Sequence, residues 1–195
     1  MLEGKLVRLR AIGPEDAERA YPWINDTEVT QYLMLRYPIS LAAERNWAQE
    51  AATKLNGFEN ELRLAVETLT DHRHIGFIGL HRVQPEDRTA ELGVAIGDKE
   101  FWAKGYGTDA ILVLLRFAFY QMNLHRVGLG VFDFNERGMA CYQKCGFQEE
   151  GRFRENHFHE GRYCDTVRMG VLRREFQDLH GRTEVSAETP DAVRV

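Results

Sequence analysis

The stretch from Thr89 to Ala110 reads TAELGVAIGDKEFWAKGYGTDA and joins a strand to a helix through a glycine-bearing loop. Residues 89–97 alternate between two faces, with larger apolar side chains on one and the small Gly93 and Ala95 beside Glu91 on the other. Glycines at the end of the loop let a ligand approach the backbone N–H groups that begin the helix, where the helix dipole is positive. The stretch therefore predicts a site for a pyrophosphate group.

This loop does not match two common nucleotide-binding motifs. No Gly-Lys-Ser/Thr sequence follows it, so it is not a Walker loop. Ala110 and Ile111 stand where a dinucleotide-binding fingerprint would have its third glycine region. An isolated Gly-x-Gly, here Gly105 and Gly107, is also compatible with a tight turn before a helix. The loop alone leaves a phosphate site and a structural turn open.

The residues on either side of the loop predict a mixed order of strands and helices. Strands are expected at residues 6–10, 61–69, 75–83, 89–97, 125–134, 147–154 and 163–172. Helices are expected at residues 14–24, 40–53, 106–122 and 136–144, with a short helical stretch ending near residue 32. This order predicts an α+β (mixed α/β) fold with one central, mostly antiparallel sheet flanked by helices. We expect one domain at residues 1–180 and a polar, disordered tail at residues 181–195.

Composition excludes several classes of protein. The 195-residue chain is 44% hydrophobic and 28% charged, with five prolines, which is ordinary for a globular domain and unlike a disordered or collagen-like chain. Its net charge of −5 provides no positive field to hold DNA or RNA. The longest apolar stretch is broken by Arg116, and residues 1–6 lack an apolar leader. We therefore expect a cytoplasmic protein with neither a nucleic-acid nor a membrane partner.

Cysteines and histidines form no recognisable metal or disulfide pattern. The cysteines are Cys141, Cys145 and Cys164, and no Cys-x-x-Cys pair occurs. His157 and His159 share a strand face, but no set of four ligands has the spacing of a zinc site. We therefore expect a reducing compartment, small buried cysteines and no metal.

A second motif lies C-terminal to the predicted anion site. Residues 135–147 read NERGMACYQKCGF, that is, an Asn, a short helix with a Tyr, then Lys-x-Gly-Phe. Together with WAKGYG at residues 102–107, it resembles the GNAT N-acetyltransferase superfamily, whose acetyl-CoA loop has the form Gln/Arg-x-x-Gly-x-Gly/Ala. Trp102 replaces the usual Gln or Arg, as in the branch that includes ribosomal-protein and spermidine acetyltransferases. The resemblance extends over residues 4–175.

The resemblance implies a GNAT fold and an enzyme that transfers the acetyl group of acetyl-CoA directly to an amine acceptor in a ternary complex. It also implies that residues 94–96 pair with the pantetheine arm like an added strand, with the Val94 N–H facing the oxyanion. Related enzymes are often dimers or larger, which implies a homo-oligomer. The expected cofactor-binding residues are Val94, Ala95, Ile96, Trp102, Ala103, Lys104, Gly105, Tyr106, Gly107, Thr108, Asn135 and Lys144.

Tyr142 and Glu91 are the candidate catalytic residues. Acetyl transfer needs a deprotonated amine and a proton for the departing thiolate. A phenol with a pKa of about 10 stays protonated at neutral pH, and a tyrosine at the Tyr142 position is the family's usual general acid. Glu91 is a candidate base, acting directly or through water, with a solvated strand carboxylate or a structural ion pair as the alternatives. Asn135 is interpreted as a helix N-cap, a pantetheine contact or both.

The sequence gives the least information about which amine is the acceptor. We expect it to be chosen by residues 23–37, by the helix at residues 40–53 and by residues 153–163. The acidic residues Asp26, Glu28, Glu44 and Glu50 either attract a polyamine or an N-terminal amine or are solvated helix charges. Protein N-termini, polyamines, aminoglycosides, amino sugars and amino acids therefore stay open as acceptors. A non-catalytic acyl-CoA-binding module also stays open as an alternative to the enzyme.

Overall fold

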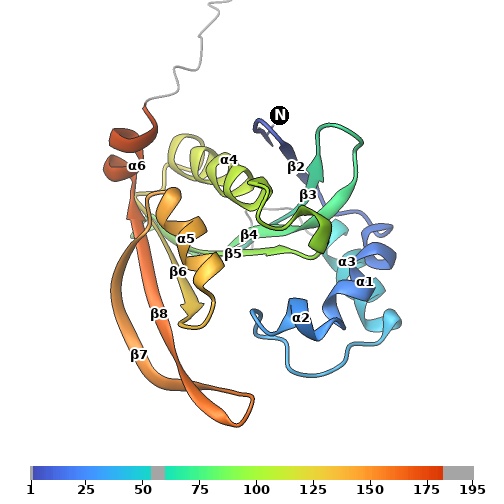
Figure 1. Cartoon of the computed structure of the whole chain (residues 1–195). Helices are drawn as coiled ribbons and strands as arrows, with labels where there is room; N and C mark the ends of the chain where they lie inside the picture. Colours follow the sequence, from blue (N-terminus) through green and yellow to red (C-terminus); the bar gives the residue numbers. More distant parts are fainter. Residues whose placement is uncertain (1, 54–59, 182–195) are drawn as a thin grey trace, which may run out of the picture.

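The computed structural model describes residues 2–53 and 60–181, and its strands form one eight-stranded sheet in the order β1-β2-β3-β4-β5-β6-β8-β7 (Figure 1). The strands are β1 (Leu2–Glu3), β2 (Val7–Ala11), β3 (Leu62–Thr68), β4 (His74–Gln84), β5 (Thr89–Ile96), β6 (Arg126–Phe132), β7 (Gln148–His159) and β8 (Arg162–Leu172). Neighbouring strands are antiparallel except β5 and β6, which are parallel. The predicted fold class, with one mostly antiparallel sheet, is confirmed.

Helices cover both faces of this sheet. They are α1 (Asp16–Ile24), α2 (Thr27–Thr30), α3 (Leu41–Thr53), α4 (Tyr106–Tyr120), α5 (Glu136–Lys144) and α6 (Arg173–His180), with a 3-10 turn, η1, at Lys99–Phe101. α4 lies on one face and α1 and α3 gather at the other (Figure 1). In the described part of the chain, no helix is long and apolar enough to cross a membrane.

Two apolar clusters follow from the alternation of side chains along the strands. Leu64 and Val66 of β3 join the large cluster under α4, whereas Ala65 between them joins the small cluster under α1 and α3. The predicted helix at residues 106–122 is present as α4 and buries an apolar stripe in the large cluster, in which Phe119 is fully buried and Phe117 only partly buried. The sheet is therefore sandwiched between helices on both faces.

One carboxylate fixes the start of α4 against the sheet. Asp109, in the first turn of the helix, accepts hydrogen bonds from the backbone N–H groups of Lys5, Leu6 and Val7, at 3.0, 2.7 and 3.0 Å. These donors belong to the turn between β1 and β2 and to the first residue of β2. The position of the α4 N-terminus relative to the strands is thus set by a partly buried, charge-assisted contact.

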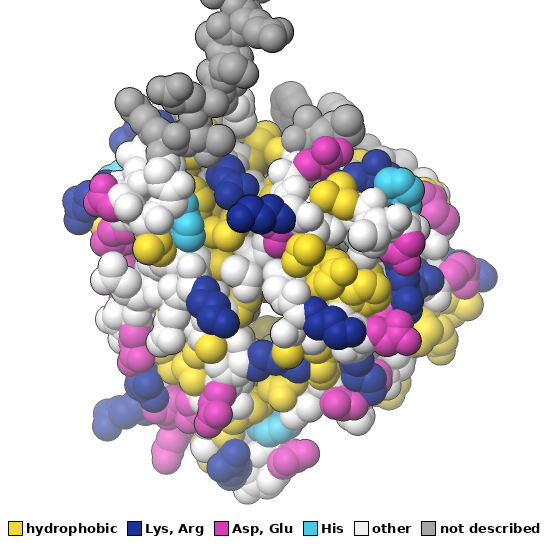
Figure 2. Space-filling view, turned by 45° about the horizontal axis from the view of Figure 1, so that its top comes forward, with side chains coloured by type: hydrophobic (Ala, Val, Ile, Leu, Met, Phe, Trp, Pro, Cys, Tyr) yellow, Lys and Arg dark blue, Asp and Glu magenta, His cyan; other side chains and the backbone are white. Residues whose placement is uncertain are grey.

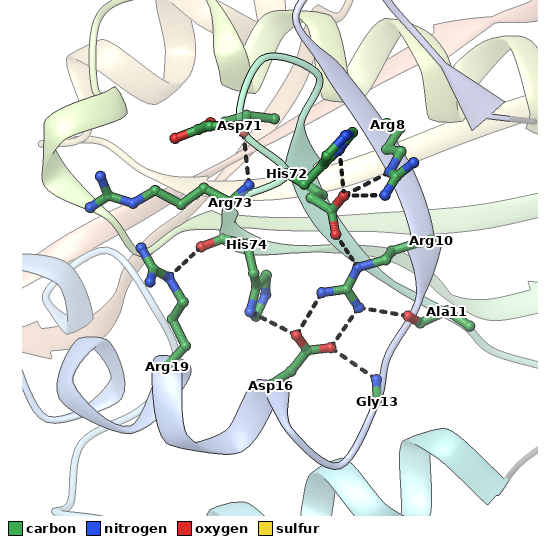
Figure 3. A network of polar contacts seen from close by, with 12 residues as sticks. Arg8, Arg10, Ala11, Gly13, Asp16, Arg19, Asp71, His72, Arg73 and His74 are labelled. Carbon is green, nitrogen blue, oxygen red and sulfur yellow. Dashed lines mark hydrogen bonds and ion pairs between the residues drawn. The ribbon is translucent and has the colours of Figure 1, made fainter.

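A second polar network joins α1 to the sheet (Figure 3). Arg10 of β2 contacts Asp16 of α1 at 2.7 Å and Glu67 of β3 at 2.6 Å. His74, at the start of β4, lies 3.1 Å from Asp16. Burial by itself would raise the pKa of Asp16, but hydrogen bonds from Arg10, His74 and the Gly13 N–H outweigh it and hold that pKa well below its usual range.

The structure lengthens one predicted strand and adds one helix that was not predicted. β7 continues to His159, five residues beyond the expected end at Arg154, because Glu160 and Gly161 form a two-residue turn in which both φ angles are positive, at 47° and 82°. α6 was not expected, since its sequence is mostly polar; its Phe176 is buried and its ring centroid lies 5.4 Å from that of Phe119. The predicted tail at residues 181–195 lies outside the described residues, apart from Gly181.

We expect Asp16→Asn to lower the free energy of unfolding by about 3 kcal/mol at neutral pH, because the substitution breaks a buried network of charged groups. The difference from wild type should narrow below about pH 4. A carboxylate whose pKa is depressed in the folded state contributes stability above its unfolded pKa and loses that contribution as the pH falls. Urea unfolding at several pH values measures both effects.

The matched control is Glu18→Gln on the same helix. Glu18 forms an ion pair with Arg45 at 2.7 Å in which both side chains are exposed, so its removal should change the free energy of unfolding by no more than about 0.5 kcal/mol. A stability difference for Asp16→Asn that does not vary with pH would contradict the assignment.

Candidate active site

β5 and β6 separate after a short parallel contact. They pair only where Thr89–Glu91 face Arg126–Gly128. Beyond this point β6 pairs with β8 through to Phe132, while β5 stays paired with β4 as far as Ile96. The C-terminal half of β5 therefore has one open edge.

The backbone of β5 directs polar groups to this open edge. The Ile96 carbonyl accepts a hydrogen bond from the Trp102 indole N–H at 2.6 Å, whereas the N–H of the next residue, Gly97, donates to Ile75 at the β4 side. Because backbone groups of successive strand residues point to opposite edges, Val94 directs its N–H and C=O to the same edge as Ile96. An extended ligand can pair with the strand here.

A cavity of about 170 Å³ lies at this edge. Most of the predicted cofactor-binding residues line it, namely Val94, Ala95, Ile96, Trp102, Ala103, Gly105, Gly107, Thr108 and Asn135. Tyr142, the candidate acid, also lines it. Lys104, Tyr106 and Lys144 do not; both lysines are exposed, and the Tyr106 ring packs edge-on against Phe101 at 4.9 Å. The structure thus brings together residues far apart in the sequence.

The loop between η1 and α4 presents helix N–H groups to the cavity. Gly105 has a φ of 90°, a left-handed conformation that favours glycine, and α4 begins at the next residue. The first helical hydrogen bond runs from the Asp109 N–H to the Gly105 carbonyl. Helix geometry therefore leaves the N–H groups of Tyr106, Gly107 and Thr108 without intrahelical acceptors, which suits an anion.

Trp102 and Arg137 close one side of the cavity. The Arg137 guanidinium lies 3.8 Å from the centroid of the Trp102 ring and 5.4 Å from that of Tyr32. Arg137 and Tyr32 both line the cavity; Arg137 was not predicted from the sequence, whereas Tyr32 lies in residues 23–37, which were expected to choose the acceptor. Asn135 could have indicated Arg137, because both lie in the first turn of the helix that Asn135 caps by accepting from the Gly138 N–H at 2.9 Å. The cap and cavity positions of Asn135 are therefore compatible.

Tyr142 is held as a neutral phenol. Burial raises its pKa, and the nearby thiols of Cys141 and Cys145 raise it further. Its ring packs edge-on against Phe147, with ring centroids 6.0 Å apart. A protonated hydroxyl at the cavity wall can donate to a group that gains negative charge.

Glu91 lies outside the residues that line the cavity and takes part in an ion pair. Its carboxylate contacts Arg168 of β8 at 2.8 Å and His81 of β4 at 3.5 Å. Partial burial opposes ionisation of Glu91, but Arg168 and its other cationic neighbours outweigh it and lower its pKa. A carboxylate with a lowered pKa is a weaker base, so this geometry favours the ion pair over the role of general base.

Cys141 has a polar environment that the sequence did not indicate. Its Sγ lies 3.2 Å from the hydroxyl of Thr108, and Cys145 follows one helical turn later on α5. Hydrogen bonds from Cys145 and Thr108 lower the pKa of the Cys141 thiol to about 7, although burial opposes this. Cys145 is fully buried and its pKa is raised. Cys141 is thus more acidic than Cys145.

The histidines on β7 take part in ring stacking. His157 stacks on Phe132 at 3.8 Å and His159 stacks on Phe134 at 4.6 Å. Within residues 2–53 and 60–181, no group of three or more His, Cys, Asp or Glu side chains is placed to hold a metal ion.

Comparisons with known proteins agree with this geometry. Residues 7–148 match the family model described as acetyltransferase (GNAT) domain. The prophage-derived uncharacterized N-acetyltransferase YokL of Bacillus subtilis (strain 168) is 30% identical over 91% of this chain and 96% of its own. YdaF of the same organism, named provisionally as a ribosomal N-acetyltransferase, is 32% identical over 88% of this chain and 93% of its own.

A solved structure extends the comparison to a bound cofactor. Spermidine N-acetyltransferase from Vibrio cholerae in complex with CoA and spermine superposes with a TM-score of 0.76 at 27% identity. The match covers 87% of this chain and 97% of the Vibrio chain.

We expect Cys141 to react with iodoacetamide faster than Cys145 and Cys164, with a rate that rises through about pH 7, because the thiolate is the reactive form. Peptide mass mapping after short exposure identifies the modified residue. Cys141→Ser should abolish the fast reaction. Labelling first at Cys164, or a rate that rises only near pH 9.0, the ordinary thiol value, would contradict the assigned environment.

Proposed function

The chain belongs to the GNAT acetyltransferase family, and on this basis we propose that it transfers the acetyl group of acetyl-CoA to a primary amine in a ternary complex. The observation that carries the proposal is the cavity where β5 and β6 separate. It combines an open strand edge, the N-terminus of α4 and Tyr142 in its lining. Each of these suits one part of the reaction.

The first part is binding of the cofactor. We propose that the N–H groups at the start of α4 hold the pyrophosphate and that residues 94–96 pair with the pantetheine arm. Lys104 and Lys144 are exposed and would add positive charge from outside the cavity wall. Figure 2 shows Lys and Arg side chains near the centre of one face, although the net charge of the chain is −5. The exposed positive charges of Lys104 and Lys144 suit a phosphate-bearing ligand on an acidic protein. The bound CoA in the Vibrio structure supports the same cofactor.

The second part is the transfer itself. The amine nitrogen attacks the thioester carbonyl carbon, and the C–S bond breaks as the new C–N bond is retained. We propose that the Val94 N–H stabilises the negative charge on the carbonyl oxygen and that Tyr142 donates its proton to the departing thiolate. The proton lost by the amine passes to a base or to water.

We propose a primary amine as the acceptor, of one of two kinds. A protein N-terminus and a polyamine-like molecule are both primary amines, and the spermine in the Vibrio structure supports the second. Amino sugars and aminoglycosides are the alternative acceptors. The presence of Tyr142 at the cavity wall disfavours a non-catalytic acyl-CoA-binding module. Cytoplasmic location and assembly into a homo-oligomer stay predictions from the sequence.

Release of CoA from acetyl-CoA in the presence of an amine panel tests the function. The panel contains spermidine, spermine, aminoglycosides, amino sugars, amino acid amides and peptides with free N-termini. Chromatographic detection of CoA is preferred because thiol reagents would also react with Cys141. We expect Tyr142→Phe to lower kcat about 100-fold or more while the KM for acetyl-CoA changes little, since only the proton donor is removed.

Two results would contradict these assignments. Absence of acetyl-CoA binding by calorimetry would overturn the proposed function. Equal kcat for wild type and Tyr142→Phe would remove Tyr142 from the proton transfer while leaving the function intact.

We expect Glu91→Gln to change kcat less than about threefold and to leave the acidic limb of the pH–rate profile unchanged, because the Glu91 carboxylate is held in an ion pair outside the cavity. It should lower the free energy of unfolding by about 1 kcal/mol. Arg168→Gln is the matched variant and should lower stability by a similar amount. Loss of the acidic limb in Glu91→Gln, but not in Arg168→Gln, would instead identify Glu91 as the base.

A further inference from the structure

A second cavity lies on the opposite face of β5. Its volume is about 400 Å³, and its lining shares Val94, Ala95 and Leu33 with that of the first cavity. It lies over β3, β4 and β5, on the face that carries the small apolar cluster under α1 and α3. An amine held in the second cavity would therefore reach the same segment of β5 at which the proposed thioester lies.

The hollow exists because two glycines face each other across neighbouring strands. Gly79 of β4 pairs with Gly93 of β5, so no side chain rises from the centre of this surface. Trp47 and Phe77 form one wall, with their rings edge-on at 5.0 Å, and Leu33 lies at the junction with the first cavity. The surroundings are mostly apolar and aromatic.

The one carboxylate of the described lining and the two acidic residues of the neighbouring α2 segment are already paired. Among its described lining residues Glu61 is the only carboxylate, and it contacts Arg63 at 2.5 Å. On the neighbouring α2 segment, Asp26 and Glu28 both contact Lys99 at 2.7 Å. A linear polyamine carries several positive charges and needs carboxylates that are free to meet them, because burying an unpaired charge is costly. The described lining of the cavity does not supply these carboxylates, and Glu44 on α3, which lies outside that lining, is a buried carboxyl whose pKa is raised by burial.

We infer that the acceptor carries an apolar side chain, aromatic or branched, next to its amino group, and that this side chain occupies the cavity over Gly79 and Gly93. An α-amino amide or a peptide N-terminus with such a first residue fits this description. The inference rests on the proposed acetyl transfer and names the substrate class for that site. Burial of the apolar group against Trp47 and Phe77 would hold the amine at the cavity junction.

Gly93 offers a sharp test of this assignment. An added Cβ at Gly93 would meet only the His81 ring, at 3.6 Å, which is ordinary van der Waals contact. At Gly79 an added Cβ would collide with the Leu62 carbonyl oxygen, so that position is unsuitable. A valine at position 93 therefore fits the strand and projects into the second cavity. Valine is also a favoured strand residue.

The experiment compares leucine amide, phenylalanine amide, glycine amide and spermidine as acceptors for the full chain with acetyl-CoA. The three amides share one kind of amine, so their comparison isolates the side chain. We expect kcat/KM for leucine or phenylalanine amide to exceed that for glycine amide and for spermidine by about tenfold or more. Gly93→Val should reduce that advantage about tenfold or more, with Gly93→Ala intermediate. The Kd for acetyl-CoA should stay unchanged in both variants.

Gly151→Val is the matched control. Gly151 lies on β7 with nothing within 4 Å of an added Cβ, so the same substitution there should leave the ratio between acceptors unchanged. Binding of phenylalanine amide to the CoA-loaded protein, measured by calorimetry, gives a readout that does not need turnover, and we expect Gly93→Val to lose it.

Results that contradict the proposed substrate class can be distinguished from results that contradict acetyl transfer. A preference for spermidine, or equal ratios between acceptors in wild type and Gly93→Val, would overturn the apolar substrate class while acetyl transfer stands. If Gly93→Val does not fold, the graded loss expected for Gly93→Ala decides the question in the same way. Absence of both acetyl-CoA binding and CoA release with every amine would overturn the proposed function and this inference together.

Discussion

The separation of β5 from β6 is the constraint on which the rest of the molecule depends. A parallel pair of strands needs a crossover connection, and here α4 provides it. Because each strand keeps an antiparallel partner on its far side, the two can diverge without losing their place in the sheet. The divergence exposes one edge of β5 close to the start of the crossover helix. Strand edge and helix N-terminus therefore meet at one cavity.

Charged contacts hold helices in place on both faces of the sheet. Asp109 ties the first turn of α4 to three backbone N–H groups at the start of β2. On the other face, Asp16 ties α1 to Arg10 and to His74. Asp109 and its donors lie far apart in the sequence, as do Asp16 and His74, so a shifted helix would leave buried polar groups without partners. The start of α4, which borders the first cavity, and α1, which packs against α3, are thus fixed by specific contacts as well as by apolar packing.

Local patterns predicted much of this arrangement, and contacts between distant residues explain the remainder. The helix α4 and the role of the glycines in the preceding loop could be predicted because each follows from a short stretch of sequence. Tyr142 could be proposed as the general acid because it belongs to the motif at residues 135–147. An ion pair of Glu91 was an open alternative, but its partner could not be identified because Arg168 lies 77 positions away. Arg137 likewise depends on Trp102 and Tyr32, which only the folded chain brings beneath its guanidinium.

Gly93 has a consequence for how such a protein can change over generations. Its backbone does not require glycine, since it lies in an ordinary strand conformation and an added Cβ would meet no close neighbour. Every glycine codon becomes an alanine or a valine codon by a single base change. A larger residue here would also suit the strand better than glycine does. The width of the second cavity is therefore within reach of one mutation that the fold accepts, so selection can alter it without first rebuilding the sheet.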